Sequence, residues 1–360
     1  MMRRSVFRRG RRARAVIWSL VTVVLTGTAL GAVVLRQNSY EIREEKVAIR
    51  HGETALDGVL ALPPDHRGRG PFGLVVFVHG DGPVDATHET FYRPIWESLA
   101  RAGYASLSWN KPGVAGSAGE WLDQTMTERA RETSDAIAWA TRQRPDIDTR
   151  RIGLWGASQA GWVLPKVAAQ TPGVRFVIAV SPAVDWRRQG RYNLLAELRA
   201  NGASPEETAT ALHRRQTTLD LLDRQASHEE YVRAVGDPQG VTAARWSFIA
   251  RNYTADATAD LRAMPPIPVL LMLAGRDVNV DVTDTETTYR NLLPASHLRV
   301  LHYPDAGHSL VKHAVEQSPA RLYLTAVLAP KVLFADGFLT DQQRFLERLD
   351  AHGDLTGATG

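Results

Sequence analysis

The hexapeptide GASQAG at residues 156–161 contains a serine that could act as a nucleophile. An apolar run, RIGLW, precedes it and a stretch with helical spacing follows, so Ser158 falls between a predicted strand and a predicted helix. A sharp strand-to-helix turn exposes a serine hydroxyl in the G-x-S-x-G nucleophile elbow, and it requires small residues, here Gly156, Ala160 and Gly161. The fifth position is Ala160 instead of the usual glycine, and Gly-x-Ser also arises by chance. The motif alone therefore leaves two interpretations, a nucleophile or a small polar residue at the end of a buried strand.

A nucleophilic serine needs a histidine that accepts its proton and an acid that fixes the tautomer of the histidine. Asp277 directly follows the apolar run IPVLLMLAG, and His308 lies in the segment DAGHSL after the next predicted strand. Asp281 and Asp284 are alternative candidates for the acid, and capping a turn is the alternative role for Asp277. The histidines show no metal-binding spacing such as H-E-x-x-H, so we expect neither a metal nor a cofactor.

The segment VVFVHGDGP at residues 75–83 could supply the electrostatic part of such a reaction. Gly80 and Gly82 allow a tight turn in which the N–H group of Asp81 points into a cavity, where it could stabilise an oxyanion. The N–H group of Gln159, at the start of the helix after the serine, is the second candidate donor. An ordinary glycine-rich turn is the alternative interpretation.

The candidate site residues lie in a chain in which strand and helix patterns alternate. Strands are predicted at 73–80, 104–109, 151–155, 174–182, 267–275 and 297–304, and helices at 91–103, 125–143, 159–170, 283–293, 318–329 and 339–353. Two shorter strands at 45–50 and 55–63 precede them and are expected to pair antiparallel. The alternation predicts an α/β fold with a mostly parallel, doubly wound sheet, and ligand sites in such sheets lie beyond the carboxyl ends of the strands.

The alternation stops after Pro182. Residues 183–260 are rich in Arg, Glu, Gln and Ala and show only helical stretches, one of them with Ser204 as a predicted N-cap. We interpret this part as a helical lid inserted into one α/β domain, whose two parts span 45–182 and 261–355.

The charge of the chain is concentrated at its beginning. The 360 residues have a formal charge of +4 at pH 7, and the first 40 residues carry eight arginines and no acidic residue. Removing these eight from the 43 basic residues leaves 35, against 39 acidic residues. The body of the protein therefore has no net charge that would favour nucleic acid. The absence of cysteine excludes disulfides and thiol chemistry.

The arginine-rich leader at residues 1–14 precedes an uncharged stretch at 15–35. At about 1.5 Å per residue this stretch reaches about 31 Å, enough to cross a bilayer core. The arginines should stay in the cytoplasm, so we expect a signal-anchor helix that leaves the catalytic domain outside. A cleaved signal peptide, which would make the protein secreted, is the alternative; the apolar stretch is long for it and continues past the small residues near Ala29–Ala32.

From about Gly73 to Leu328 the chain resembles an α/β-hydrolase of the dienelactone hydrolase and serine-peptidase-like group. The resemblance is carried by HGDGP, LSWNKPGVAGSAGEW, RIGLWGASQAGWVLPKVAA, IPVLLMLAGRDVNV and DAGHSL. It implies that Ser158 is the nucleophile, His308 the general base and Asp277 its orienting acid. It also implies that the N–H groups of Asp81 and Gln159 form the oxyanion hole.

We therefore predict a serine hydrolase that cleaves an ester, or a thioester or amide, of a small acyl substrate through an acyl-enzyme. The chain departs from the group at Asp81, at Lys111-Pro112 and at Ala160. These departures motivate the alternative of a membrane-tethered hydrolase-fold protein that binds a ligand without turnover. An aminopeptidase or a lipase is a further alternative.

Overall fold

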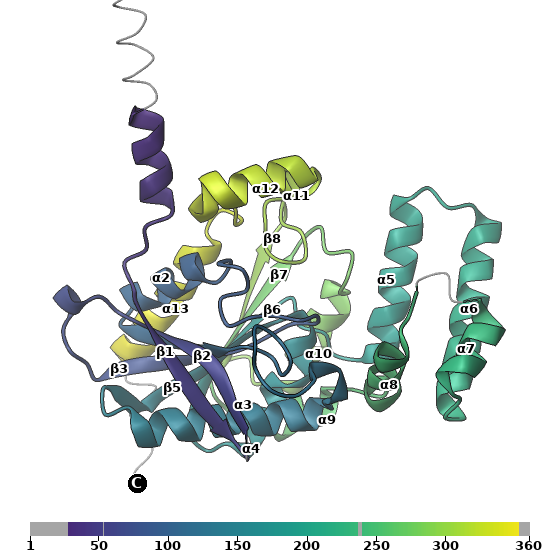
Figure 1. The fold of residues 1–360 in the computed structure, drawn as a ribbon, viewed down its shortest axis with the longest axis horizontal. Helices are drawn as coiled ribbons and strands as arrows, with labels where there is room; N and C mark the ends of the chain where they lie inside the picture. The colour runs from purple at the N-terminus through teal and green to yellow at the C-terminus, as the bar shows by residue number, and fades with distance from the viewer. Residues whose placement is uncertain (1–27, 53, 237–239, 353–360) are drawn as a thin grey trace, which may run out of the picture.

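The computed structural model describes residues 28–52, 54–236 and 240–352. Its centre is an eight-stranded sheet of the order β1-β2-β4-β3-β5-β6-β7-β8 (Figure 1). The strands are β1 (Arg43–His51), β2 (Thr54–Leu62), β3 (Phe72–Val78), β4 (Tyr104–Trp109), β5 (Ile147–Ala157), β6 (Val174–Val180), β7 (Val269–Ala274) and β8 (Leu298–Tyr303). The pairings of β1 with β2 and of β2 with β4 are antiparallel, and all others are parallel. The predicted mostly parallel sheet is confirmed.

Helices cover both faces of this sheet, which explains why its central strands are apolar throughout. All seven residues of β3 are buried. Val75 and Phe77 face a core with α2 (Arg93–Arg101) and α13 (Phe338–His352), whereas Leu74 and Val76 face a core with α3 (Met126–Gln143), α4 (Leu164–Gln170) and α10 (Val282–Leu292). Because side chains alternate along a strand, a strand buried on both faces reads as a continuous apolar run.

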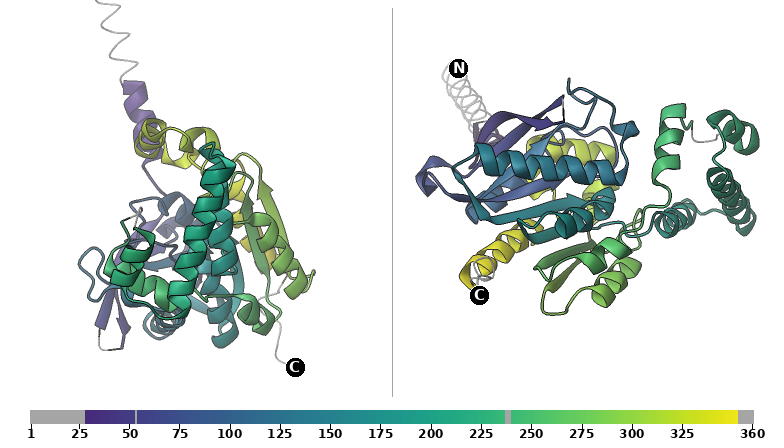
Figure 2. Two further views of the ribbon diagram at one scale, coloured as in Figure 1. Left: turned by 90° about the vertical axis from the view of Figure 1, so that its right-hand side faces the viewer. Right: turned by 90° about the horizontal axis from the view of Figure 1, so that it is seen from below.

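Five helices lie between β6 and β7: α5 (Trp186–Ala200), α6 (Pro205–Asp223), α7 (His228–Val235), α8 (Ala243–Asn252) and α9 (Thr258–Ala263). The pair α6 and α7 stands away from the sheet, and α9 packs below it with Leu261 in the sheet's core (Figures 1 and 2). Leu221, Tyr231 and Trp246 form a separate small core among α6, α7 and α8. Ser204 caps α6 in a reciprocal capping box, as its sequence predicts.

Most of the predicted signal-anchor at 15–35 lies outside the described residues. From residue 28 the chain forms a helix up to residue 37, and this helix lies beside α12 (Pro319–Leu328), where the Asn38 side chain donates to the carbonyl of Val327 at 3.0 Å. Within the described part of the chain, no helix has both the length and the apolar character that crossing a bilayer requires.

Candidate active site

Ser158 lies on a strained turn directly after β5. Its φ is +57°, a left-handed conformation that costs a residue with a side chain about 1–3 kcal/mol. The strand ends at Ala157, and a 3-10 helix follows at Ser158–Trp162. The turn thus places the serine beyond the carboxyl end of a central strand, where the G-x-S-x-G pattern requires it.

The small residues around Ser158 are required by close packing. A Cβ added at Gly156 would lie 2.6 Å from the Cβ of Ala160 and 3.0 Å from the carbonyl oxygen of Val78. Ala160 is fully buried, so its methyl group fills the space that Gly156 leaves open. The alanine is therefore compatible with the turn as long as residue 156 has no side chain.

The segment after the serine differs from the prediction in one respect. We expected an α-helix from Gln159, but α4 begins only at Leu164, after the 3-10 helix. Pro165 explains the delay, because it has no N–H to donate to the carbonyl of Gly161 and is tolerated only in the first turn of a helix. The N–H groups nearest Ser158 therefore belong to a 3-10 turn and not to the first turn of α4.

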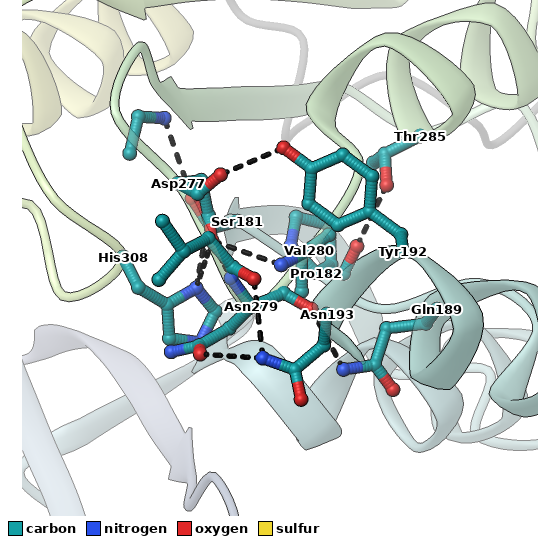
Figure 3. A network of polar contacts seen from close by, with 12 residues as sticks. Ser181, Pro182, Gln189, Tyr192, Asn193, Asp277, Asn279, Val280, Thr285 and His308 are labelled. Atoms are coloured by element: carbon teal, nitrogen blue, oxygen red, sulfur yellow. Dashed lines mark hydrogen bonds and ion pairs between the residues drawn. The ribbon is translucent and has the colours of Figure 1, made fainter. Parts of the chain in front are cut away.

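His308 and Asp277 lie in loops after β8 and β7 and form a hydrogen-bonded pair (Figure 3). Nδ1 of His308 is 2.8 Å from Oδ2 and 3.0 Å from Oδ1 of Asp277, whose carboxylate is fully buried. The N–H groups of Asn279 and Val280 donate to Oδ1, each at 2.9 Å. Tyr192 of α5 donates to the Asp277 carbonyl at 2.8 Å. These bonds fix the acid and leave Nε2 of the imidazole as the nitrogen available to a reacting group.

The two alternative acids have other roles in the structure. Asp281 caps α10, where its carboxylate accepts the N–H groups of Thr283 and Asp284 at 3.1 Å each. Asp284 accepts a hydrogen bond from Arg188 at 2.8 Å. Only Asp277 of the three contacts His308 in the described structure.

Ser158 and His308 line one cavity of about 800 Å³, together with Gly80, Asp81 and Gln159. The walls combine aromatic side chains, among them Phe91, Trp186 and Phe248, with charged ones such as Arg214 and Glu197. Every residue of the predicted catalytic and oxyanion set therefore borders this cavity, apart from Asp277, which reaches it through His308.

The turn after β3 lies against Ser158, since a Cβ added at Gly80 would be 3.6 Å from the Cβ of Ser158. Lys111 is buried below this turn, and its Nζ donates to the carbonyls of Gly80 at 2.6 Å and Gly82 at 2.8 Å. In a planar trans peptide the N–H group points opposite to the carbonyl, so the N–H group of Asp81 points away from Lys111. Burial, with the charge of Arg129 adding to it, lowers the pKa of Lys111 well below its usual value.

The Asp81 carboxylate is held by two side chains. Arg245 of α8 donates from Nη1 to Oδ1 at 2.9 Å and from Nη2 to Oδ2 at 2.5 Å, and Gln159 donates from Nε2 to Oδ1 at 3.0 Å. Burial favours the neutral acid, but the hydrogen bonds and charge of Arg245, with the charge of Lys111, outweigh it and lower the pKa of Asp81. The carboxylate therefore stays ionised and paired.

Arg129 of α3, which the sequence analysis missed, orients Gln159. It is buried and donates from Nη1 to Oε1 of Gln159 and from Nη2 to the carbonyl of His79, both at 2.5 Å. Its position in the sequence could have indicated this role, because helical spacing places Arg129 on the buried face of an amphipathic helix, beside Ala130 and Thr133. Arg245 has no comparable signal, because its partner Asp81 is 164 positions away.

Residues 28–302 match the family model of the X-Pro dipeptidyl-peptidases (S15). The chain is similar to esterase EstD of Thermotoga maritima, 24% identical over 271 residues that cover 73% of this chain and 60% of the esterase. An esterase of Pyrococcus furiosus has a TM-score of 0.53 at 16% identity, over 85% of this chain and 91% of that one. An acylaminoacyl peptidase of Pyrococcus horikoshii has a TM-score of 0.53 at 13% identity, over 91% and 44%. The chain spans between 16% and 60% of the length of the curated relatives it matches.

Proposed function

The chain belongs to the X-Pro dipeptidyl-peptidase (S15) family and has the α/β-hydrolase fold, and from this premise we propose that it is a serine hydrolase cleaving an ester, thioester or amide bond. The observation that carries the proposal is the position of two side chains on one cavity: Ser158 on its strained turn, and His308 oriented by a buried acid.

In the proposed reaction, Nε2 of His308 takes the proton of the Ser158 hydroxyl as its oxygen attacks the substrate carbonyl. The bond from the carbonyl carbon to the leaving group then breaks, and the imidazolium returns its proton to the leaving oxygen, sulfur or nitrogen. Water, activated by the same imidazole, hydrolyses the acyl-enzyme. The N–H groups of Asp81 and Gln159 stabilise the charge that develops on the carbonyl oxygen.

Covalent labelling tests the proposal. The full chain, treated with a fluorophosphonate probe, should become labelled on Ser158, and Ser158→Ala should abolish both labelling and turnover. Ser309→Ala is the matched control, because Ser309 borders the same cavity beside His308 and is not part of the proposed catalytic set. A folded wild type that is neither labelled nor active on acyl esters would instead favour the ligand-binding alternative.

We propose an ester with an apolar acyl group as the preferred substrate, because aromatic side chains such as Phe91, Trp186 and Phe248 give the cavity an apolar part that could hold the acyl chain. The family match favours a second candidate, a peptide bond. Nitrophenyl esters of increasing chain length, compared with aminoacyl and dipeptidyl nitroanilides, separate the two. A kcat/KM that rises with acyl length supports the ester, and a higher kcat/KM for a nitroanilide supports the peptidase.

We also propose that α5–α8 act as a lid over this cavity. Side chains from each of these helices border the cavity, including Trp186 and Asn193 of α5, Arg214 of α6, Tyr231 of α7 and Trp246 of α8. A lid that contributes several walls would set substrate specificity.

A membrane anchor at 15–35, with the catalytic domain outside the cytoplasm, completes the proposal. The arginine-rich leader supports it, as do the exposed apolar side chains of Leu30, Val33 and Leu35. The full chain should then resist alkaline extraction from membranes, whereas Leu25→Arg, which places a charge in the uncharged stretch, should be extracted. A mature protein whose N-terminal sequence begins near residue 32 would show cleavage instead.

A further inference from the structure

Asp81 raises an electrostatic problem that the rest of the site must solve. Its N–H group is a proposed oxyanion donor, and its own carboxylate is bonded to the side chain of the second donor residue, Gln159. A carboxylate near a developing oxyanion destabilises the transition state through like-charge repulsion, which solvent weakens here because the Asp81 side chain is 42% exposed. A cation bound to this carboxylate reduces the remaining repulsion.

Arg245 is placed to supply that cation from α8. Its guanidinium binds both oxygens of Asp81 in the two-pronged geometry that guanidinium and carboxylate favour. The group is oriented by aromatic rings, with its Cζ 5.0 Å from the ring centre of Phe248 and 5.8 Å from that of Trp121. Two further cations face the turn: Lys111, through the Gly80 and Gly82 carbonyls, and Arg129, through Gln159.

These cations differ in what they contact. Lys111 and Arg129 are buried and bind the turn and Gln159 from inside the domain. Arg245 belongs to the helical segment between β6 and β7, and among the three it alone donates to the Asp81 carboxylate in the described structure. The cation hydrogen-bonded to the Asp81 carboxylate therefore comes from α8, which is held on the domain by Phe248 in the core of the sheet.

We infer that Arg245 of α8 is a positioning residue for the oxyanion site and that its pairing with Asp81 is required for fast acyl transfer. The inference rests on the proposed function. Arg245 acts through Asp81: it cancels the carboxylate charge and keeps Asp81 in contact with Gln159, so that both proposed N–H donors stay in place. Without the guanidinium, the unpaired carboxylate opposes the reaction.

A double-mutant cycle tests this coupling in the full chain. Arg245→Gln should lower kcat on a nitrophenyl ester about tenfold to hundredfold, with KM changed by less than about threefold, because the loss occurs in the transition state. Adding Asp81→Asn should restore at least about tenfold of that loss, since an amide has no charge to cancel. The matched control is Arg251→Gln on the same helix, whose arginine pairs with Asp123 at the surface and should change kcat less than about twofold.

The kcat values of these variants can overturn the proposed role of Arg245. An Arg245→Gln variant as fast as wild type overturns the inference, and so does a double variant as slow as Arg245→Gln. If Arg245→Gln does not fold, Asp81→Asn is compared with Asp81→Asn/Arg245→Gln: nearly equal kcat values support the coupling, and a further loss of tenfold or more contradicts it. Fluorophosphonate labelling of wild-type Ser158 is measured in parallel. Absence of labelling would refute the proposed function itself. Labelling of Ser158 together with an unchanged kcat in Arg245→Gln would refute only this inference.

Discussion

Gly161 lies against the backbone of Ala183, so closely that a Cβ added at Gly161 would be 2.2 Å from the carbonyl oxygen and 2.6 Å from the nitrogen of Ala183. The N–H group of Ala183 in turn donates to the carbonyl of Ser158 at 3.0 Å. The turn that carries the serine is therefore fixed against the loop after β6, and this contact has no room for a side chain. The neighbouring position is different, because Ala160 already carries a methyl group in a filled space.

We accordingly predict that two single-methyl changes destabilise the fold to different extents. Gly161→Ala should destabilise the fold by about 3 kcal/mol or more, since backbone atoms cannot move aside as a flexible side chain can. Ala160→Gly, which restores the G-x-S-x-G pattern, should cost only about 1 kcal/mol and leave kcat within about threefold. Urea unfolding and ester hydrolysis measure both. Equal stability of Gly161→Ala and wild type would show that the contact is looser than described.

The acid that orients His308 should be distinguishable from its neighbours by kinetics. Asp277→Asn should lower kcat about 10⁴-fold, because an amide at this position favours the wrong imidazole tautomer. The matched control, Asp281→Asn, should keep kcat within about twofold, because asparagine caps a helix about as well as aspartate. If both variants lost activity to the same extent, the assignment of Asp277 would fail.

Arg129 should be more important for stability than a surface arginine two positions away. Arg129→Met removes a buried donor from the Gln159 side chain and the His79 carbonyl and leaves both acceptors unpaired, so it should destabilise the fold by about 3 kcal/mol. Arg131→Met on the same helix changes an exposed residue and should stay within about 0.5 kcal/mol. Similar unfolding free energies for the two variants would contradict a special role for Arg129.

The sequence predicted the residues of the site that follow directly from the strands. A strand buried on both faces is recognisable in the sequence as an apolar run. Ser158 and Asp277 each follow such a run, and His308 follows the next strand after the run that precedes Asp277. Parallel strands bring their carboxyl ends to one edge, so order along the chain predicted where the candidates lie. It left Asp281 and Asp284 open as the acid, and only Asp277 is hydrogen-bonded to His308 in the described structure.

The charged contacts around Asp81 follow from packing and not from a local pattern. From the sequence, Asp81 was predicted as an oxyanion donor through its N–H group, whereas its carboxylate and Lys111 were noted only as departures from a family motif. Lys111 can bind two carbonyls of the turn because β4 ends beside β3. Arg245 can reach Asp81 because of where α8 packs. Helical periodicity predicts that α8 exists but not what it faces. Pro165 is an exception, because its delay of α4 was readable from the sequence through the missing N–H.

His79 precedes the turn that carries Asp81 and is buried as a neutral imidazole. Nε2 donates to the carbonyl of Trp109 at 2.5 Å, and Nδ1 accepts the hydroxyl of Tyr92 at 3.1 Å. Burial, together with the charge of Lys111, lowers the pKa of His79 from 6.5 to about 3. Between these two values the unfolded chain binds a proton at this residue and the folded chain does not, so the stability of the fold decreases as the pH falls through this window.

We therefore expect His79 to make the free energy of unfolding depend on pH at the acidic side of neutrality. Between pH 6 and pH 4 the wild type should lose about 1.4 kcal/mol more per pH unit than His79→Gln, because one pKa unit corresponds to about 1.4 kcal/mol and glutamine does not titrate. Urea unfolding of both proteins at several pH values measures the two slopes, and a lower overall stability of the variant does not affect the comparison. Parallel slopes would mean that the imidazole takes up its proton without unfolding, and thus that it is not held neutral between Trp109 and Tyr92.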